Sequence, residues 1–170
     1  DVGALREQTL TENASVLADA ANALRASFER GGKLLALGNG GSATDAMDVV
    51  ADVRAGGRPA IDLTEDPGIL TAIVNDIGVE AIFSRQVIAY GAPGDVVLAL
   101  STSGNSGNVI HALAEARRRE LVTIAMVGYD GGRVLGEGLA DQVVVTRSEH
   151  IPRIQEAQAS AYHALVELVG

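Results

Sequence analysis

Short apolar runs alternate along the chain with segments of helical pattern, and this alternation limits the folds available to it. A continuous apolar run is typical of a strand buried on both faces of a parallel sheet. The runs lie at 33–37, 59–63, 95–100, 121–126 and 142–146, and the helical segments lie at 42–54, 68–74, 80–89, 106–119 and 152–169. The order predicts a three-layer α/β fold around a five-stranded, doubly wound parallel sheet.

Length and composition favour one folded domain. The 170 residues are 47% hydrophobic and 21% charged, so we expect a single domain over residues 1–170 that opens with a helical segment, one or two helices, over residues 1–30. No apolar run reaches the roughly 18 residues of a membrane span. A net charge of −9 without a basic cluster disfavours nucleic acid. The sequence predicts neither a membrane nor a nucleic-acid partner, and a cytoplasmic location is the default.

Two loops rich in Ser and Gly follow strands of the predicted sheet. Residues 38–42 read Gly-Asn-Gly-Gly-Ser, and residues 101–106 read Ser-Thr-Ser-Gly-Asn-Ser. Each loop leads into a helix, whose first N–H groups are unpaired and whose dipole favours an anion. Since ligands bind at the carboxyl ends of the strands in such sheets, the loops predict a phosphate-binding edge. A loop of this kind also occurs without a ligand, as a turn with a Ser N-cap.

A dinucleotide site is an alternative for the first loop. Gly38, Gly40 and Ala43 fit the spacing of the dinucleotide fingerprint, and Asp62 stands near the end of the second strand, where a ribose-binding acid is expected. The hydroxyl groups of the second loop have no role in that motif, and the chain leaves little room for a separate substrate domain. We therefore prefer a phosphate site to a dinucleotide oxidoreductase.

Two helices carry side chains suited to a metal or to proton transfer. Asp48 and Asp52 are four residues apart and share a helix face, and Gln155 and His163 share a face of the last helix. The chain has no Cys, so any metal must use imidazole, carboxylate or amide ligands. A carboxylate and an imidazole are also common acid–base groups. Spacing alone favours the simpler alternative, in which Asp48 and Asp52 lie on a solvated helix face and His163 lies at the edge of the core.

Four segments together resemble the sugar isomerase (SIS) family. They are GNGGSATDA at 38–46, AIVND at 72–76, STSGNS at 101–106 and RIQE at 153–156. The resemblance covers nearly the whole chain. It implies a parallel sheet of flavodoxin type, a homotetramer with active sites at subunit interfaces, and aldose–ketose isomerisation of a sugar phosphate of heptose or octose size through an enediol.

The resemblance also implies roles for individual residues. Asp52 and His163 would be the catalytic pair. Binding of the substrate, with the phosphate at the hydroxyl groups, would fall to Asn39, Gly40, Ser42, Asp76, Ser101, Thr102, Ser103, Ser106 and Gln155. A divalent metal, zinc in the family, would be held by Asp48, Asp52, Gln155 and His163.

The chain departs from the family pattern at two of these positions. The family usually has Glu where Asp52 stands, and Asp shortens the reach of the carboxylate by one C–C bond, about 1.5 Å. It usually has His where Asp48 stands, and a harder oxygen ligand shifts preference away from zinc. The tract between the helix of Asp52 and the second strand is shorter than in the family. The basic residues that flank the substrate in the family therefore have no one-to-one match here, and Arg58 is only a candidate for one of them. The alternatives are a non-catalytic SIS protein that binds a phosphosugar or a replication initiator, and an isomerase for an octose phosphate.

Overall fold

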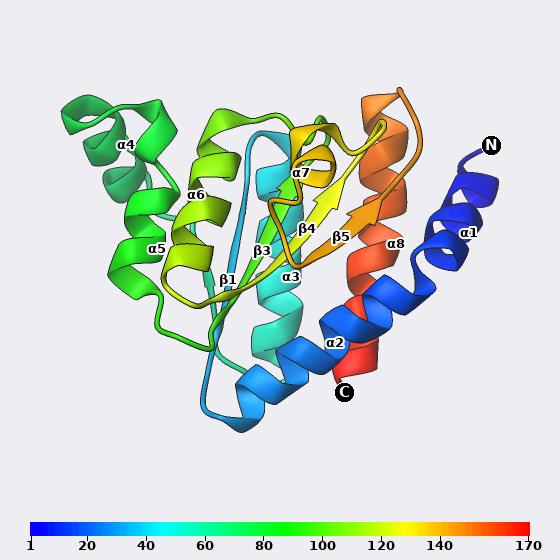
Figure 1. Cartoon of the computed structure of the whole chain (residues 1–170), viewed down its shortest axis with the longest axis horizontal. Coiled ribbons are helices and arrows are strands. Elements are labelled where there is room, and N and C mark those ends of the chain that lie inside the picture. The colour runs from blue at the N-terminus through cyan, green and yellow to red at the C-terminus, as the bar shows by residue number, and fades with distance from the viewer.

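A five-stranded parallel sheet runs through the middle of the molecule (Figure 1). The computed structural model describes residues 1–170, and the strands are ordered β2-β1-β3-β4-β5 across the sheet. They are β1 (Leu34–Gly38), β2 (Ala60–Asp62), β3 (Val96–Ser101), β4 (Val122–Val127) and β5 (Gln142–Val145). Every neighbouring pair is parallel. The predicted fold class is confirmed.

Helices cover both faces of the sheet, which explains why its central strands are apolar without alternation. The helices on one face are α2 (Ala14–Glu29), α3 (Gly41–Ala55) and α8 (Ile151–Val169); those on the other are α5 (Ser84–Tyr90), α6 (Gly107–Arg118) and α7 (Gly132–Gly136). In β1, Leu34 and Ala36 pack with the first group, and Leu35 and Leu37 pack with the second. Side chains alternate between faces, so both sets are buried.

The amino-terminal segment forms two helices, joined at Asn13. Helix α1 (Val2–Glu12) packs along α8, and α2 lies against the sheet. The buried Asn13 amide donates to the Val145 carbonyl at 2.9 Å and accepts from the Val145 N–H at 3.0 Å. It thereby pairs backbone groups of β5 that an edge strand otherwise leaves open.

Three predicted boundaries differ from the structure. The helix predicted over 80–89 is divided into a short 3₁₀ turn, η1 (Val79–Ala81), and α5, with the buried Phe83 between them. Helix α4 (Pro67–Asp76) is longer than the predicted 68–74, because Asp66 caps its first N–H groups. Helix α7 is absent from the prediction, since it begins between glycines at positive φ. None of the helices combines the length and the apolar character needed to cross a bilayer.

Candidate active site

The first loop is a tight connection between β1 and α3. A Cβ on Gly38 would lie 2.7 Å from the Ser42 carbonyl oxygen, so the backbone of α3 approaches the end of β1 too closely for any side chain there. Gly40 has a φ of +57°, which favours glycine. Ser42 is buried in the first turn of α3, while Asn39 and Gly40 are exposed. The two glycines thus set the path of the loop.

The second loop is held by its own hydroxyl groups. Ser101 Oγ accepts from the Gly104 N–H at 3.2 Å and lies 3.3 Å from Ser106 Oγ. Ser103 Oγ accepts from the Asn105 N–H at 3.1 Å. Ser106 is the N-cap of α6, but its side chain makes no capping hydrogen bond. The Ser106 side chain therefore leaves the first N–H groups of α6 uncapped, next to a loop that carries several hydroxyl groups.

The two loops lie at the same edge of the sheet and are joined by an amide pair. Their strands, β1 and β3, are neighbours. Asn39 Nδ2 donates to Asn108 Oδ1 at 2.8 Å, and Asn108 Nδ2 donates to Asn39 Oδ1 at 3.1 Å. The structure therefore places the two loops side by side at one edge of the sheet, with the amino-terminal ends of α3 and α6 beside them.

A carboxylate that is not among the predicted site residues, that of Glu80, lies at the start of α6. A Cβ on Gly107 would be 2.1 Å from Glu80 Oε2, so the Glu80 side chain packs directly on the first helical turn. Negative charge is favourable at a helix N-terminus. No sequence signal identifies Glu80, because its place depends on η1 packing beside α6.

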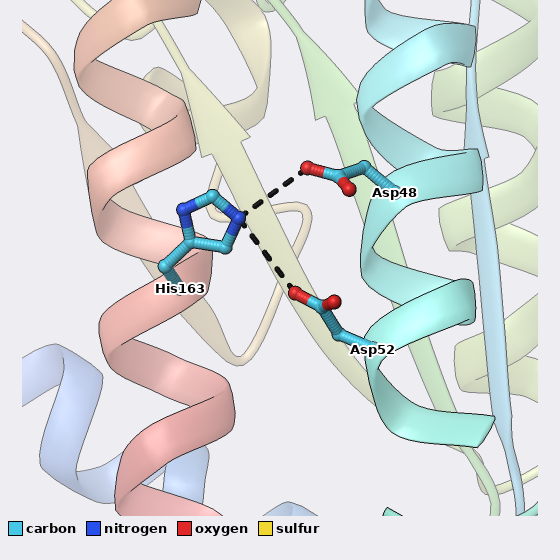
Figure 2. Close-up of side chains that lie close together, drawn as sticks. All are labelled: Asp48, Asp52 and His163. Atoms are coloured by element: carbon cyan, nitrogen blue, oxygen red, sulfur yellow. Dashed lines mark ion pairs between the residues drawn. The ribbon is translucent and has the colours of Figure 1, made fainter. Parts of the chain in front are cut away.

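Asp48, Asp52 and His163 form a cluster between two neighbouring helices (Figure 2). The His163 Nε2 atom lies 3.3 Å from Asp48 Oδ2 and 3.6 Å from Asp52 Oδ2. All three side chains are about half exposed, so a ligand has access to them. The two carboxylates share one face of α3, and the imidazole reaches them from α8. The cluster combines two oxygen ligands and one nitrogen ligand.

A buried phenol, Tyr162, and a half-buried carboxyl, Asp45, lie beside the cluster. The Tyr162 hydroxyl donates to Asp48 Oδ2 at 2.7 Å. Burial, followed by the hydrogen bond to Asp48, raises the pKa of Tyr162 well above its ordinary value, so the hydroxyl keeps its proton. Burial, followed by the charge of Asp48, also raises the pKa of Asp45. Neither residue is among the site residues predicted from the sequence.

The remaining predicted site residues lie in different places. Gln155 lies near the amino-terminal end of α8, beside the start of α3. A Cβ on Gly41, the first residue of α3, would be 2.1 Å from Gln155 Nε2. Its Cα is eight residues, or about 12 Å of helix, from that of His163. Asp76 is exposed at the end of α4, which projects far from α3 and α8 (Figure 1). Its place near a sugar, like the homotetramer, stays a prediction.

Arg58 follows the carboxyl end of α3 and lies near Asp52 of the cluster. Its guanidinium carbon is 5.3 Å from the centre of the Phe28 ring, and both residues line a small pocket that Asp52 also lines. The two other histidines are exposed outside the cluster, His111 on α6 and His150 at the N-cap of α8. His163 is thus the histidine that meets carboxylates in the structure.

The site has two chemically distinct parts along α3. Ser42 belongs to the edge formed by the two loops, and Asp48 and Asp52 follow it by six and ten residues, which is about 9 and 15 Å of helix. The edge can hold an anionic group. The cluster can exchange protons through a carboxylate and an imidazole, or bind a divalent cation.

Comparison with known proteins gives the same relationship from sequence and from structure. The family model described as SIS domain matches residues 1–128. The chain is 43% identical to the phosphoheptose isomerase of Chlorobium phaeobacteroides, over 97% of this chain and 76% of that protein. The phosphoheptose isomerase structure from Neisseria gonorrhoeae superposes with a TM-score of 0.94 at 35% identity, covering 99% of this chain and 92% of that one.

A second solved structure agrees. The phosphoheptose isomerase from Francisella tularensis gives a TM-score of 0.93 at 32% identity, covering 99% of this chain and 91% of that one. The matched regions cover almost the full length of this chain, so they span both loops and both helices of the cluster. The chain belongs to the SIS domain family and, within it, to the phosphoheptose isomerases.

Proposed function

We propose that the chain is an aldose–ketose isomerase that acts on sedoheptulose 7-phosphate. The observation that carries the proposal is the 43% identity to a phosphoheptose isomerase over 97% of the chain. The close contact of His163 with Asp48 and Asp52 supports it, because aldose–ketose isomerisation needs two groups that exchange protons. A phosphosugar-binding protein without activity has no need of such a pair.

Asp52 and His163 divide the proton transfers of the proposed reaction. Asp52 takes the proton from the carbon beside the carbonyl, which gives a cis-enediol, and returns it to the neighbouring carbon. His163 moves a proton between the two oxygens, and a neutral imidazole can both donate and accept near neutral pH. The hydroxyl groups at 101–106 hold the phosphate, so binding energy remote from the reacting carbons positions them.

The test is proton exchange with solvent. Sedoheptulose 7-phosphate is incubated with the protein in D₂O and followed by NMR. Deuterium at the carbon beside the carbonyl, together with signals of the aldose, is the expected result. Binding of the sugar phosphate in a calorimeter without any exchange would refute the isomerase and identify a phosphosugar-binding protein instead.

The cluster also fits a divalent cation. The ligand atoms of Asp48, Asp52 and His163 lie within 4.8 Å of one another, and imidazole and carboxylate are common ligands of such ions. We propose that these three residues hold the ion. When bound, it supplies Lewis-acid polarisation of the oxygens of the sugar.

Zinc affinity should depend on which donor stands at position 48. We expect Asp48→His to raise the zinc affinity by about tenfold or more, because imidazole suits zinc better than a harder carboxylate oxygen. His163→Gln should lower it by a similar factor. Calorimetric titration with zinc alone measures both. Equal affinities for the wild type and both variants would contradict a site at the cluster.

Displacing the backbone of the second loop should weaken the binding of phosphate. Gly104 has a φ of +67°, and a Cβ there would lie 2.3 Å from the Gly131 carbonyl oxygen. Backbone strain of about 1–3 kcal/mol is typical of such positions, so Gly104→Ala should weaken binding of sedoheptulose 7-phosphate by about tenfold or more. Gly136→Ala is the control, since a Cβ there meets nothing within 4 Å. Equal affinities in calorimetry would show that the loop does not hold the phosphate.

A further inference from the structure

Tyr162 links the hydrophobic core to the candidate active site. Its side chain is 2% exposed and packs in the core cluster that α2, α3 and α8 build on the sheet. A buried phenol usually finds a hydrogen-bond partner for its hydroxyl. Here the partner is Asp48 Oδ2, 2.7 Å away on the neighbouring helix. The well-packed ring therefore fixes the position of the hydroxyl.

The oxygen that Tyr162 holds is the one that faces the imidazole. Asp48 Oδ2 accepts the tyrosine hydroxyl and lies 3.3 Å from His163 Nε2. The Asp48 side chain is 48% exposed, so packing alone does not select one rotamer for it. The Tyr162 hydroxyl, anchored in the core, selects one rotamer of Asp48, because rotation of the carboxylate breaks the hydrogen bond between them.

Tyr162 also touches the imidazole directly. The two rings meet edge to face, with 4.7 Å between their centres. Adjacent residues of a helix point in directions about 100° apart, so Tyr162 enters the core while His163 faces the exposed carboxylates. One buried side chain thereby contacts both members of the Asp48–His163 pair.

We propose that Tyr162 is a positioning residue for the isomerase reaction: its hydroxyl holds Asp48 against His163 Nε2, and Asp48 in turn orients the imidazole. The proposal rests on the proposed function for its catalytic meaning. The contacts themselves do not depend on that function. In the metal-free site Nε2 faces the carboxylate oxygens of both Asp48 and Asp52, which favours the imidazole tautomer that carries its proton on Nε2.

Tyr162→Phe tests the proposal, because it removes the hydroxyl and keeps the ring in the core. We expect kcat for sedoheptulose 7-phosphate to fall about ten- to a hundredfold, with KM within about twofold, since the phosphate loops are unchanged. Tyr90→Phe is the matched control: Tyr90 is half-buried at the end of α5, and its hydroxyl makes no hydrogen bond. A kcat for Tyr162→Phe equal to that of the control would overturn the proposal.

A second measurement separates this inference from the proposed function. The ¹⁵N chemical shifts of the His163 ring report which nitrogen carries the proton. In the metal-free wild type we expect the proton on Nε2, and in metal-free Tyr162→Phe a smaller fraction of that tautomer. Identical shifts in the two proteins would refute the positioning role. A wild type that does not turn over the sugar would refute the isomerase, and the ring shifts would still decide what Tyr162 does.

Discussion

Asp52→Asn should abolish the exchange of the substrate proton with solvent. The carboxylate lies 3.6 Å from His163 Nε2 and is about half exposed, so it can reach both a bound sugar and the imidazole. An amide of nearly the same shape cannot accept the carbon-bound proton. Loss of a general base typically costs about a hundred- to ten-thousandfold in rate. Deuterium incorporation into sedoheptulose 7-phosphate, followed by NMR, measures the loss.

Asp52→Glu is the matched variant for charge. It keeps the carboxylate and lengthens the side chain by about 1.5 Å, to the residue usual at this position in the family. We expect this variant to keep measurable exchange, at a rate that differs from the wild type because reach matters for proton transfer. Wild-type exchange in Asp52→Asn would remove Asp52 from the proton transfer.

The fold could be predicted because its strands are buried on both faces. A fully covered strand such as β3, where all six residues are buried, leaves a continuous apolar run in the sequence. The segment around η1 and α5 could not be predicted in the same way. Phe83 turns into the core between two short helical pieces, and that break depends on tertiary packing rather than on local spacing.

In the candidate site, too, local sequence patterns predict some features, and tertiary packing decides the others. The loops at 38–42 and 101–106 could be located from glycine, serine and their place after strands. The shared face of Asp48 and Asp52 follows from helical spacing. The meeting of His163 with these carboxylates follows from neither, because it depends on α8 lying beside α3. It was proposed from family resemblance, and the structure shows the contact.

Two further contacts have no sequence signal of their own. Tyr162 has the pattern of a core residue, and its ring is indeed in the core; only the structure shows that its hydroxyl emerges at Asp48. Glu80 has the pattern of an exposed helical residue, yet its carboxylate packs on Gly107. In both cases the informative atom is at the far end of a long side chain, where spacing along the chain no longer constrains it.

His163→Ala should abolish turnover and leave binding of the sugar phosphate nearly intact. The imidazole is the group that moves a proton between the two oxygens, and its removal should lower kcat by about a hundred- to ten-thousandfold. The serine loops lie at the start of α3 and α6 and do not contact His163, so the affinity measured by calorimetry should change by less than about threefold. This separation of rate from binding is expected when a lost interaction acts only in the transition state.

Two comparisons make the His163 result specific. His111→Ala removes an exposed imidazole on α6, on the opposite face of the sheet, and should leave turnover unchanged. Free imidazole added to His163→Ala should restore part of the rate, because the native side chain is 52% exposed and the space it leaves is open to solvent. Turnover by His163→Ala at the wild-type rate would exclude the imidazole from the reaction. Rescue by imidazole would instead place the missing proton carrier at this position on α8, beside the carboxylates of α3.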